Sequence, residues 1–144
     1  MQTMSKAFGM ASVRVGIAFA SPAIIQYFNK MKPPYNISTI NQETVLKRLT
    51  VISSYRKQVT KIVEERERLS KEIIKAEVVH KVYPSDANFL LVRFPDADTV
   101  YNYLADRGII VRNRSRAVDN CLRITVGTKT ENNILLRALK SIQL

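Results

Sequence analysis

The stretch Asn-Phe-Leu-Leu-Val-Arg-Phe at residues 88–94 is the clearest strand signal in the C-terminal half of the sequence, because it is rich in apolar and aromatic side chains. A second strand is predicted just before it, at residues 78–83. After it, Asp96 or Asp98 is placed to cap a helix, and Gly108 is placed to end that helix.

Two further strands and a final helix are predicted downstream. The strands cover residues 109–112 and 121–126 and are separated by a polar loop. The spacing Thr128-x-x-Glu131 is a capping box, which predicts the start of a helix with one apolar side. The order β-β-α-β-β-α predicts a small α/β sandwich with helices packed on a sheet.

A long helical region precedes this sandwich. Residues 35–83 contain neither Gly nor Pro, and apolar residues recur at helical spacing to about Ala76. Thr39-x-x-Gln42 has the spacing of a capping box at its start, and a break is expected near residues 53–54. A helix of this length is typical of a connector between two bodies.

The N-terminal region is predicted to contribute one strand and one helix. Residues 13–20 are apolar except for Arg14 and are predicted to form a strand buried in a sheet. Ser21 and Pro22 then mark the start of a helix that ends before the prolines at 33–34. We expect an α/β protein in three parts: residues 1–34, 35–77 and 78–144.

The charge of the chain predicts an anionic partner. Lys and Arg number 23 against 12 Asp and Glu, a net charge of +11. Nucleic acid, a membrane surface or phosphorylated small molecules would each suit this excess. No apolar run is long enough to span a membrane. The single cysteine, Cys121, cannot form an internal disulfide, which favours a reducing compartment such as the cytoplasm.

The single histidine and cysteine exclude the common metal sites. Because His80 and Cys121 are alone of their types, a zinc site is not expected, and Cys121 is predicted to be a small apolar core residue. A Ser-His-Asp triad would need His80, but no glycine-elbow motif is present.

The residues with the strongest chemical signal lie between Thr3 and Gly16. Lys6 is surrounded by small and apolar residues, with the hydroxyls of Thr3 and Ser5 close by. A lysine of lowered pKa suits Schiff-base chemistry. Arg14 interrupts the predicted strand, and a buried guanidinium needs an anion; its planar fork suits a phosphate.

Five stretches resemble the fold-type I pyridoxal-phosphate aminotransferases, and more narrowly the histidinol-phosphate aminotransferases. They occur in the order typical of that family and extend over nearly the whole chain. These stretches are SKAFGMASVRVG (5–16), KPPYNIS (32–38), SDANF (85–89), GIIVR (108–112) and CLRITVGT (121–128).

The resemblance implies a cofactor site in the N-terminal region. Lys6 matches the lysine that forms the Schiff base with pyridoxal 5'-phosphate and moves the proton at the substrate's α-carbon. Thr3, Ser5 and Arg14 match positions that hold the cofactor phosphate. Most of the cofactor domain of such enzymes precedes this lysine, whereas five residues precede Lys6 here. We therefore expect the C-terminal portion of such an enzyme, inactive alone.

The resemblance also implies substrate contacts. Arg123 matches the arginine that receives the substrate carboxylate, or the corresponding end of the phosphorylated amine. Arg112 matches an arginine near the substrate phosphate. Asn36 falls in a loop lining the cleft. The implied reaction moves an amino group between L-histidinol phosphate and 2-oxoglutarate, a step of histidine biosynthesis, in a homodimeric cytoplasmic enzyme.

Three other interpretations are open. A related enzyme such as a threonine-phosphate decarboxylase would share the lysine and the arginines. A basic nucleic-acid-binding module would explain the charge, but aromatics such as Tyr27 and Tyr103 follow helical spacing and do not alternate with basic residues. An interaction fragment could complete a partner's sheet with residues 13–20, and such a strand, exposed, predicts self-association.

Overall fold

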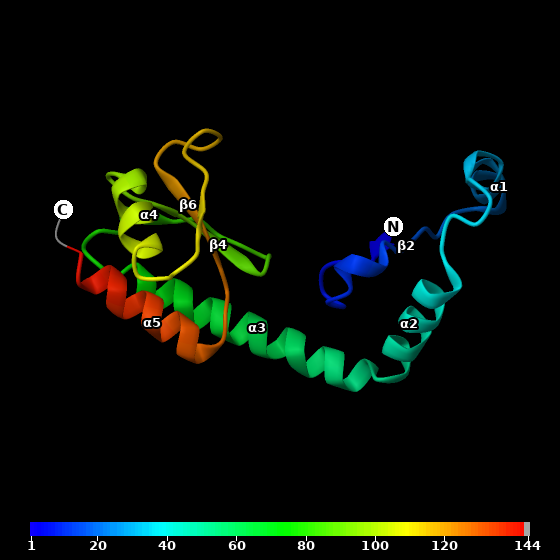
Figure 1. Ribbon diagram of the computed structural model, residues 1–144, viewed down its shortest axis with the longest axis horizontal. Coiled ribbons are helices and arrows are strands. Elements are labelled where there is room, and N and C mark those ends of the chain that lie inside the picture. Colours follow the sequence, from blue (N-terminus) through cyan, green and yellow to red (C-terminus); the bar gives the residue numbers. More distant parts are fainter. Residues whose placement is uncertain (143–144) are drawn as a thin grey trace. The chain divides into compact units, whose positions relative to one another are not determined.

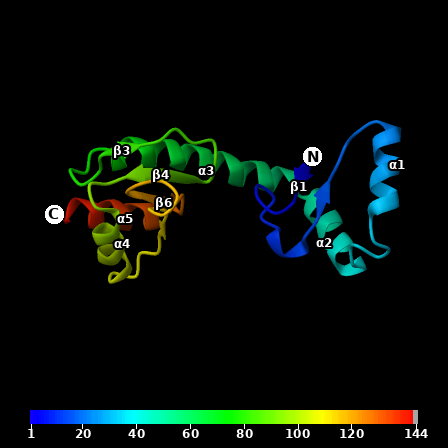
Figure 2. The same cartoon turned by 90° about the horizontal axis from the view of Figure 1, so that it is seen from above.

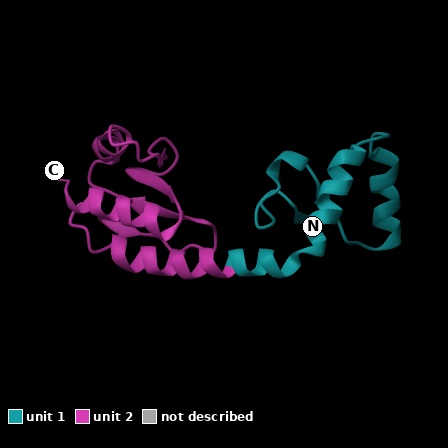
Figure 3. Cartoon of the chain, turned by 60° about the horizontal axis from the view of Figure 1, so that its bottom comes forward, with its two compact units in different colours: residues 1–59 teal, residues 60–144 magenta. Residues whose placement is uncertain are grey.

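The computed structural model describes residues 1–142. The chain forms two compact units, residues 1–59 and residues 60–144 (Figure 3). The helix α3, Ile52–Ile73, belongs partly to each. The units are described separately below.

The second unit is built on a four-stranded antiparallel sheet with the strand order β3-β4-β6-β5. Figure 1 labels its two central strands, β4 and β6. Chain order is β-β-α-β-β-α, as predicted. The outer strands are shorter than expected, and β5 begins where the predicted strand 109–112 ends. The elements are β3 Lys81–Val82, β4 Phe89–Arg93, α4 Ala97–Ala105, β5 Arg112–Asn113, β6 Cys121–Thr125 and α5 Lys129–Lys140.

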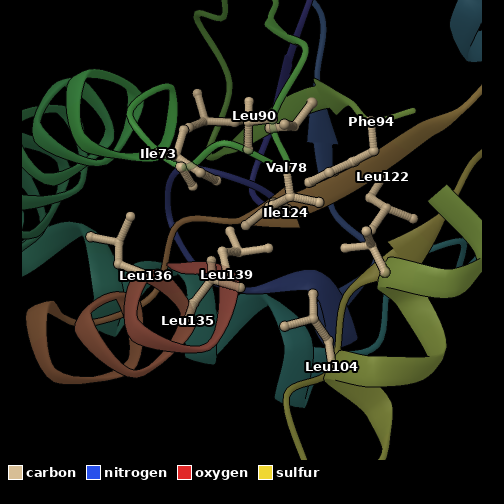
Figure 4. Close-up of a cluster of buried hydrophobic side chains, with 14 of the residues drawn as sticks. Ile73, Val78, Leu90, Phe94, Leu104, Leu122, Ile124, Leu135, Leu136 and Leu139 are labelled. Carbon is tan, nitrogen blue, oxygen red and sulfur yellow. The ribbon is translucent and has the colours of Figure 1, made fainter. Parts of the chain in front are cut away.

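One hydrophobic cluster joins the sheet to all three helices (Figure 4). Ile73 of α3, Leu104 of α4 and Leu139 of α5 are buried together with Leu90 and Leu122 from the two central strands. Fully burying a side chain of this size contributes roughly 1.5–3 kcal/mol. Because side chains alternate along a strand, the residues between these core positions lie on the opposite face of the sheet. The predicted sandwich is confirmed.

Local capping residues define the helix starts of this unit. Asp96 accepts hydrogen bonds from the backbone of Asp98 and Thr99, so it is the cap of α4. Thr128 and Glu131 form the predicted capping box of α5. Hydrogen bonds lower the pKa of the Asp96 carboxyl and of the Glu131 carboxyl. The largest effect comes from the Thr99 hydroxyl at Asp96 and from the Thr128 backbone N–H at Glu131.

A polar network ties α3 to the start of α5. Asn132 is 2% exposed. Its amide donates to Glu65 Oε1 (2.9 Å) and Gly127 O (3.1 Å) and accepts from Gly127 N (3.1 Å). Arg68 donates to both oxygens of the same carboxylate, from Nη2 to Oε1 (2.6 Å) and from Nε to Oε2 (2.9 Å). This hydrogen bonding, from Arg68 above all, holds the pKa of Glu65 below its ordinary value against the opposing effect of burial.

The first unit contains two short strands, a 3-10 turn and two helices, of which β1, α1 and α2 are labelled in Figure 2. A second apolar cluster lies in this unit. Met4, Met10, Val13 and Val15 are buried against Val45 of α2. The elements are β1 Gln2–Thr3, the 3-10 turn Ala11–Val13, β2 Gly16–Ile17, α1 Pro22–Met31 and α2 Thr39–Thr50.

The prediction of a buried strand over residues 13–20 is wrong. Only Gly16–Ile17 pair, with Gln2–Thr3. Arg14 has a φ of 52°, which ends the preceding 3-10 turn and cannot continue a strand. Within residues 1–142, β1 is the one strand that pairs with β2. The interpretation that residues 13–20 complete a partner's sheet therefore loses its basis.

The predicted break in the long helix is confirmed but lies earlier. α2 ends at Thr50, α3 begins at Ile52, and Val51 between them leaves the helical region with φ −110° and ψ 39°. The predicted capping box at Thr39 is wrong by one residue, because Ser38 is the cap and accepts from Asn41 N. None of the helices within residues 1–142 is long and apolar enough to cross a bilayer.

Candidate functional site

Lys6 lies at the tip of a hydrogen-bonded loop, residues 4–10, called the lysine loop below. Gly9 N donates to Lys6 O (2.8 Å), and Met10 N donates to Met4 O (3.0 Å) at the base. Gly9 has a φ of 69°, which a residue without Cβ adopts readily. Met4 is buried whereas Lys6 is exposed, so the loop is anchored at its base and presents the amine to solvent.

Two of the predicted phosphate ligands, Thr3 and Arg14, flank the lysine loop in the sequence, and the third, Ser5, lies within the loop. Thr3 Oγ1 accepts a hydrogen bond from Ser5 N (3.1 Å), which fixes the turn into the loop. Arg14 donates from Nη1 to Ala11 O (3.1 Å). No acidic residue precedes Glu43 in the sequence. Hydroxyl, ammonium and guanidinium donors without a carboxylate in the segment suit an anionic group such as a phosphate.

The expectation that Arg14 is buried is wrong. Its side chain is exposed and leaves the 3-10 turn instead of lying in a strand. A buried charge therefore does not demand an anion at this position. Arg14 instead has an exposed guanidinium, and its left-handed backbone ends the 3-10 turn.

Asn36 lies in the connection between α1 and α2. It is exposed, while its neighbour Ile37 packs against the cluster beneath the lysine loop. Within residues 1–142, no hydrogen bond joins Asn36 to the predicted phosphate ligands. The structure thus places it in the same unit as Lys6 without bringing the two together.

The second unit brings the two predicted substrate residues together. Arg112 on β5 lies directly opposite Arg123 on β6 in the antiparallel register. Directly opposed side chains project from the same face of a sheet. For Arg123 this is the face away from the helical core, since its neighbours Leu122 and Ile124 are buried in that core.

Arg123 contacts an aromatic ring, but one of its hydrogen-bond donors has no partner. Its guanidinium lies 5.2 Å from the centre of the Phe89 ring, a cation–π arrangement. Its Nε is shielded from solvent and has no hydrogen-bond partner in the structure. A buried donor without a partner costs free energy, and a bound carboxylate or phosphate would remove that cost. The Arg112–Arg123 pair therefore has the chemistry of an anion site.

Sequence reasoning missed the aromatic residues at both places. Phe89 lies beside Arg123 because of the β4–β6 register, in which Leu91 is opposite Arg123. Tyr55 stacks on Phe8 of the lysine loop. Neither contact has a local signal, because each joins residues far apart in the sequence.

The cysteine and histidine behave as structural or surface residues. Cys121 is fully buried, and burial raises the pKa of its thiol, so the predicted core role is confirmed. His80 is exposed, and its backbone N donates to Arg93 O. No group of three potential metal ligands occurs among the residues that the structure describes.

Comparison with known families identifies the class of protein. The model of the aminotransferase class I and II family matches residues 1–139. The chain belongs to this family. The α/β fold predicted for the C-terminal part of a fold-type I aminotransferase is confirmed with it.

Curated relatives narrow the resemblance to one branch. The chain is 48% identical over 143 residues to the histidinol-phosphate aminotransferase of Flavobacterium psychrophilum, covering 98% of this chain and 41% of the relative. It is 49% identical over 146 residues to that of Parabacteroides distasonis, covering 100% and 42%. The predicted resemblance is confirmed, and the chain spans about two fifths of the length of these relatives.

Solved structures agree on the fold. The histidinol-phosphate aminotransferase of Sinorhizobium meliloti, solved with pyridoxal-5'-phosphate, is 26% identical with a TM-score of 0.78, covering 96% of this chain and 39% of that one. An L-threonine-O-3-phosphate decarboxylase from Porphyromonas gingivalis also matches, with a TM-score of 0.74 over 96% of this chain and 44% of that one. At 20% identity, this second likeness shows the fold alone.

Proposed function

We propose that this chain supplies the lysine-bearing segment and the small domain of an aminotransferase that uses pyridoxal 5'-phosphate. The proposed reaction moves an amino group between L-histidinol phosphate and 2-oxoglutarate in histidine biosynthesis. The observation that carries the proposal is the exposed Lys6 at the tip of an anchored loop, in a segment with cations and hydroxyls but no carboxylate before Glu43.

The proposed cofactor site uses residues of the first unit. When bound, pyridoxal 5'-phosphate supplies an electron sink for the substrate carbon that carries the amine. Lys6 Nζ would carry the covalent link and move the proton at that carbon. Arg14, Thr3 and Ser5 would hold the phosphate. The donor set fits this group, because it offers charged and neutral donors to one dianion.

Two of the three proposed substrate contacts, Arg112 and Arg123, belong to the second unit, and Asn36 belongs to the first. Arg123 would bind the substrate's anionic end, since its buried Nε lacks a hydrogen-bond partner and its guanidinium lies 5.2 Å from the centre of the Phe89 ring. Arg112, directly opposite Arg123, would bind the phosphate of the substrate. Asn36 would line the cleft. Both proposed substrates carry negative charge, in agreement with the excess of cations in the chain.

The proposal includes the organisation of the enzyme. Residues 1–34 would be the end of the cofactor domain, 35–77 the connecting helices and 78–144 the small domain. We propose a cytoplasmic homodimer, with the lone buried cysteine in support of a reducing compartment. The 144-residue chain alone would be inactive and would self-associate, because Phe19, Tyr27 and Met31 are 73%, 68% and 83% exposed.

A chimeric enzyme tests the proposed function. In it, this chain replaces the matching 143 residues of the Flavobacterium psychrophilum relative. With L-histidinol phosphate and 2-oxoglutarate, the chimera is expected to form glutamate. The variant Lys6→Ala should abolish this activity, whereas the matched control Lys47→Ala, an exposed lysine of α2, should keep it.

Two results would contradict the proposal. Glutamate formation that survives in Lys6→Ala would remove Lys6 from the reaction. Release of CO2 from L-threonine O-3-phosphate, without glutamate formation from histidinol phosphate, would assign the chain to the decarboxylases instead.

A further inference from the structure

Phe8 connects the tip of the lysine loop to a helix. Its ring stacks on that of Tyr55, with centroids 4.4 Å apart and planes inclined by 7°. Both rings are half-buried, whereas Lys6 and Ala7 beside them are exposed. Stacked aromatic pairs stabilise a structure beyond the area that they bury. The stack therefore restrains the part of the loop that carries the amine.

The bend between α2 and α3 brings Tyr55 to this position. Tyr55 lies in the first turn of α3, and its N donates to Val51 O (3.4 Å) at the bend. Arg48 of α2 donates to Gln58 Oε1 of α3 (2.8 Å), which ties the two helices together across the bend. The bend is thus fixed by side chains as well as by the backbone.

The other side of the bend contacts the base of the same loop. Val45 of α2 is buried in the cluster with Met4 and Met10, the two residues that close the lysine loop. Since α2 holds the base and α3 holds Phe8 near the tip, the bent helix pair contacts the loop at two points. The bend allows Val45 of α2 and Tyr55 of α3 to contact the same loop.

We propose that Tyr55 is a positioning residue for Lys6: by stacking on Phe8, it restricts the lysine loop to the conformation that presents the Lys6 amine. This inference rests on the proposed role of Lys6 as the covalent attachment point. Tyr55 itself does not contact the reacting atoms in this account. Its effect is on the population of the correct loop conformation.

Hydrogen exchange of the 144-residue chain tests the restraint without any cofactor. The amides of Gly9 and Met10 close the lysine loop, so their exchange reports its opening. Tyr55→Leu should speed their exchange by roughly 2- to 10-fold, the range expected for the loss of a stacked pair. Tyr55→Phe should restore the wild-type rate. The matched control is Tyr27→Leu, an exposed tyrosine of α1 in the same unit.

Reductive labelling tests the consequence for the amine. The chimera is incubated with pyridoxal 5'-phosphate, reduced with borohydride and mapped by peptide mass spectrometry. In the wild type, Lys6 should be labelled in preference to the exposed Lys47. This preference should fall roughly 2- to 10-fold in Tyr55→Leu. It should persist in Tyr55→Phe and Tyr27→Leu.

The two readouts separate the two hypotheses. If Lys6 is preferred in the wild type but neither exchange nor labelling changes in Tyr55→Leu, the inference about Tyr55 is wrong and the role of Lys6 stands. If Lys6 is not labelled in preference to Lys47 in the wild type, the proposed function loses its support. The exchange rates alone then test whether Tyr55 restrains the lysine loop. Should Tyr55→Leu fail to fold, Phe8→Leu removes the same stack from the loop side and must give the same result.

Discussion

Arg112 and Arg123 face each other directly across β5 and β6, as a pair of like charges on adjacent strands. Like charges in directly opposed positions destabilise a sheet. Asp119 is occupied elsewhere, in an ion pair with Arg93 (2.9 Å). The sheet thus tolerates a repulsion that a bound anion would turn into an attraction.

Removing one member of this pair should stabilise the free chain. Arg112→Gln is expected to raise the free energy of unfolding by about 0.2–1 kcal/mol, because the opposed charge is removed. Denaturant unfolding of the 144-residue chain measures this. Arg116→Gln, in the neighbouring loop, should change it by less than about 0.5 kcal/mol. A clear loss of stability in Arg112→Gln would show that the pair is not repulsive.

The same pair should be required for substrate binding. In the chimera, Arg123→Gln should raise the KM for 2-oxoglutarate by about 10- to 100-fold, since a charge-assisted hydrogen bond to the carboxylate is lost. Steady-state kinetics measure this, with Arg116→Gln as the control. An unchanged KM in Arg123→Gln would remove this residue from the substrate site.

The buried amide of Asn132 should be important for stability. Asn132→Ala removes its hydrogen bonds to Glu65 and Gly127 and should lower the free energy of unfolding by about 2–4 kcal/mol. The matched control is the neighbouring Asn133, which accepts one exposed hydrogen bond from Arg68. Asn133→Ala should lower the free energy of unfolding by less than about 1 kcal/mol. Equal losses for the two variants would contradict this ranking.

The Glu65–Arg68 pair predicts an acid dependence of stability. Because folding lowers the pKa of Glu65, the ionised carboxylate stabilises the fold at pH values above its ordinary pKa of 4.5. This stabilisation is lost as the pH falls from that value through the lowered pKa. Thermal unfolding of Glu65→Gln should therefore depend less on pH in this range than that of the wild type. Glu64→Gln, at the exposed neighbouring position, should behave like the wild type.

Predictions from local sequence succeeded where the interaction itself is local. The capping box at Thr128 and Glu131 and the cap at Asp96 involve residues at most three apart, and both are confirmed. The prediction of Thr39 as the cap failed because the preceding Ser38 can also cap, and the backbone conformation decides between them.

Predictions failed where a distant partner decides the structure. Residues 13–20 have the composition of a buried strand, but the left-handed backbone of Arg14 and a single short partner strand limit pairing to Gly16–Ile17. The contacts of Phe8 with Tyr55 and of Arg123 with Phe89 also depend on tertiary packing. For the candidate site, Lys6 and Arg123 could be proposed from the sequence and stay predictions, but the aromatic side chains beside them could not be proposed.

The visible absorption of the purified chimera tests the central claim most directly. After incubation with pyridoxal 5'-phosphate and removal of the excess, the chimera should keep the absorption band of a lysine-bound cofactor, and Lys6→Ala should lose it while Lys47→Ala retains it. A band that persists in Lys6→Ala, or that is absent from the unmodified chimera, would contradict the assignment of Lys6 as the covalent attachment point.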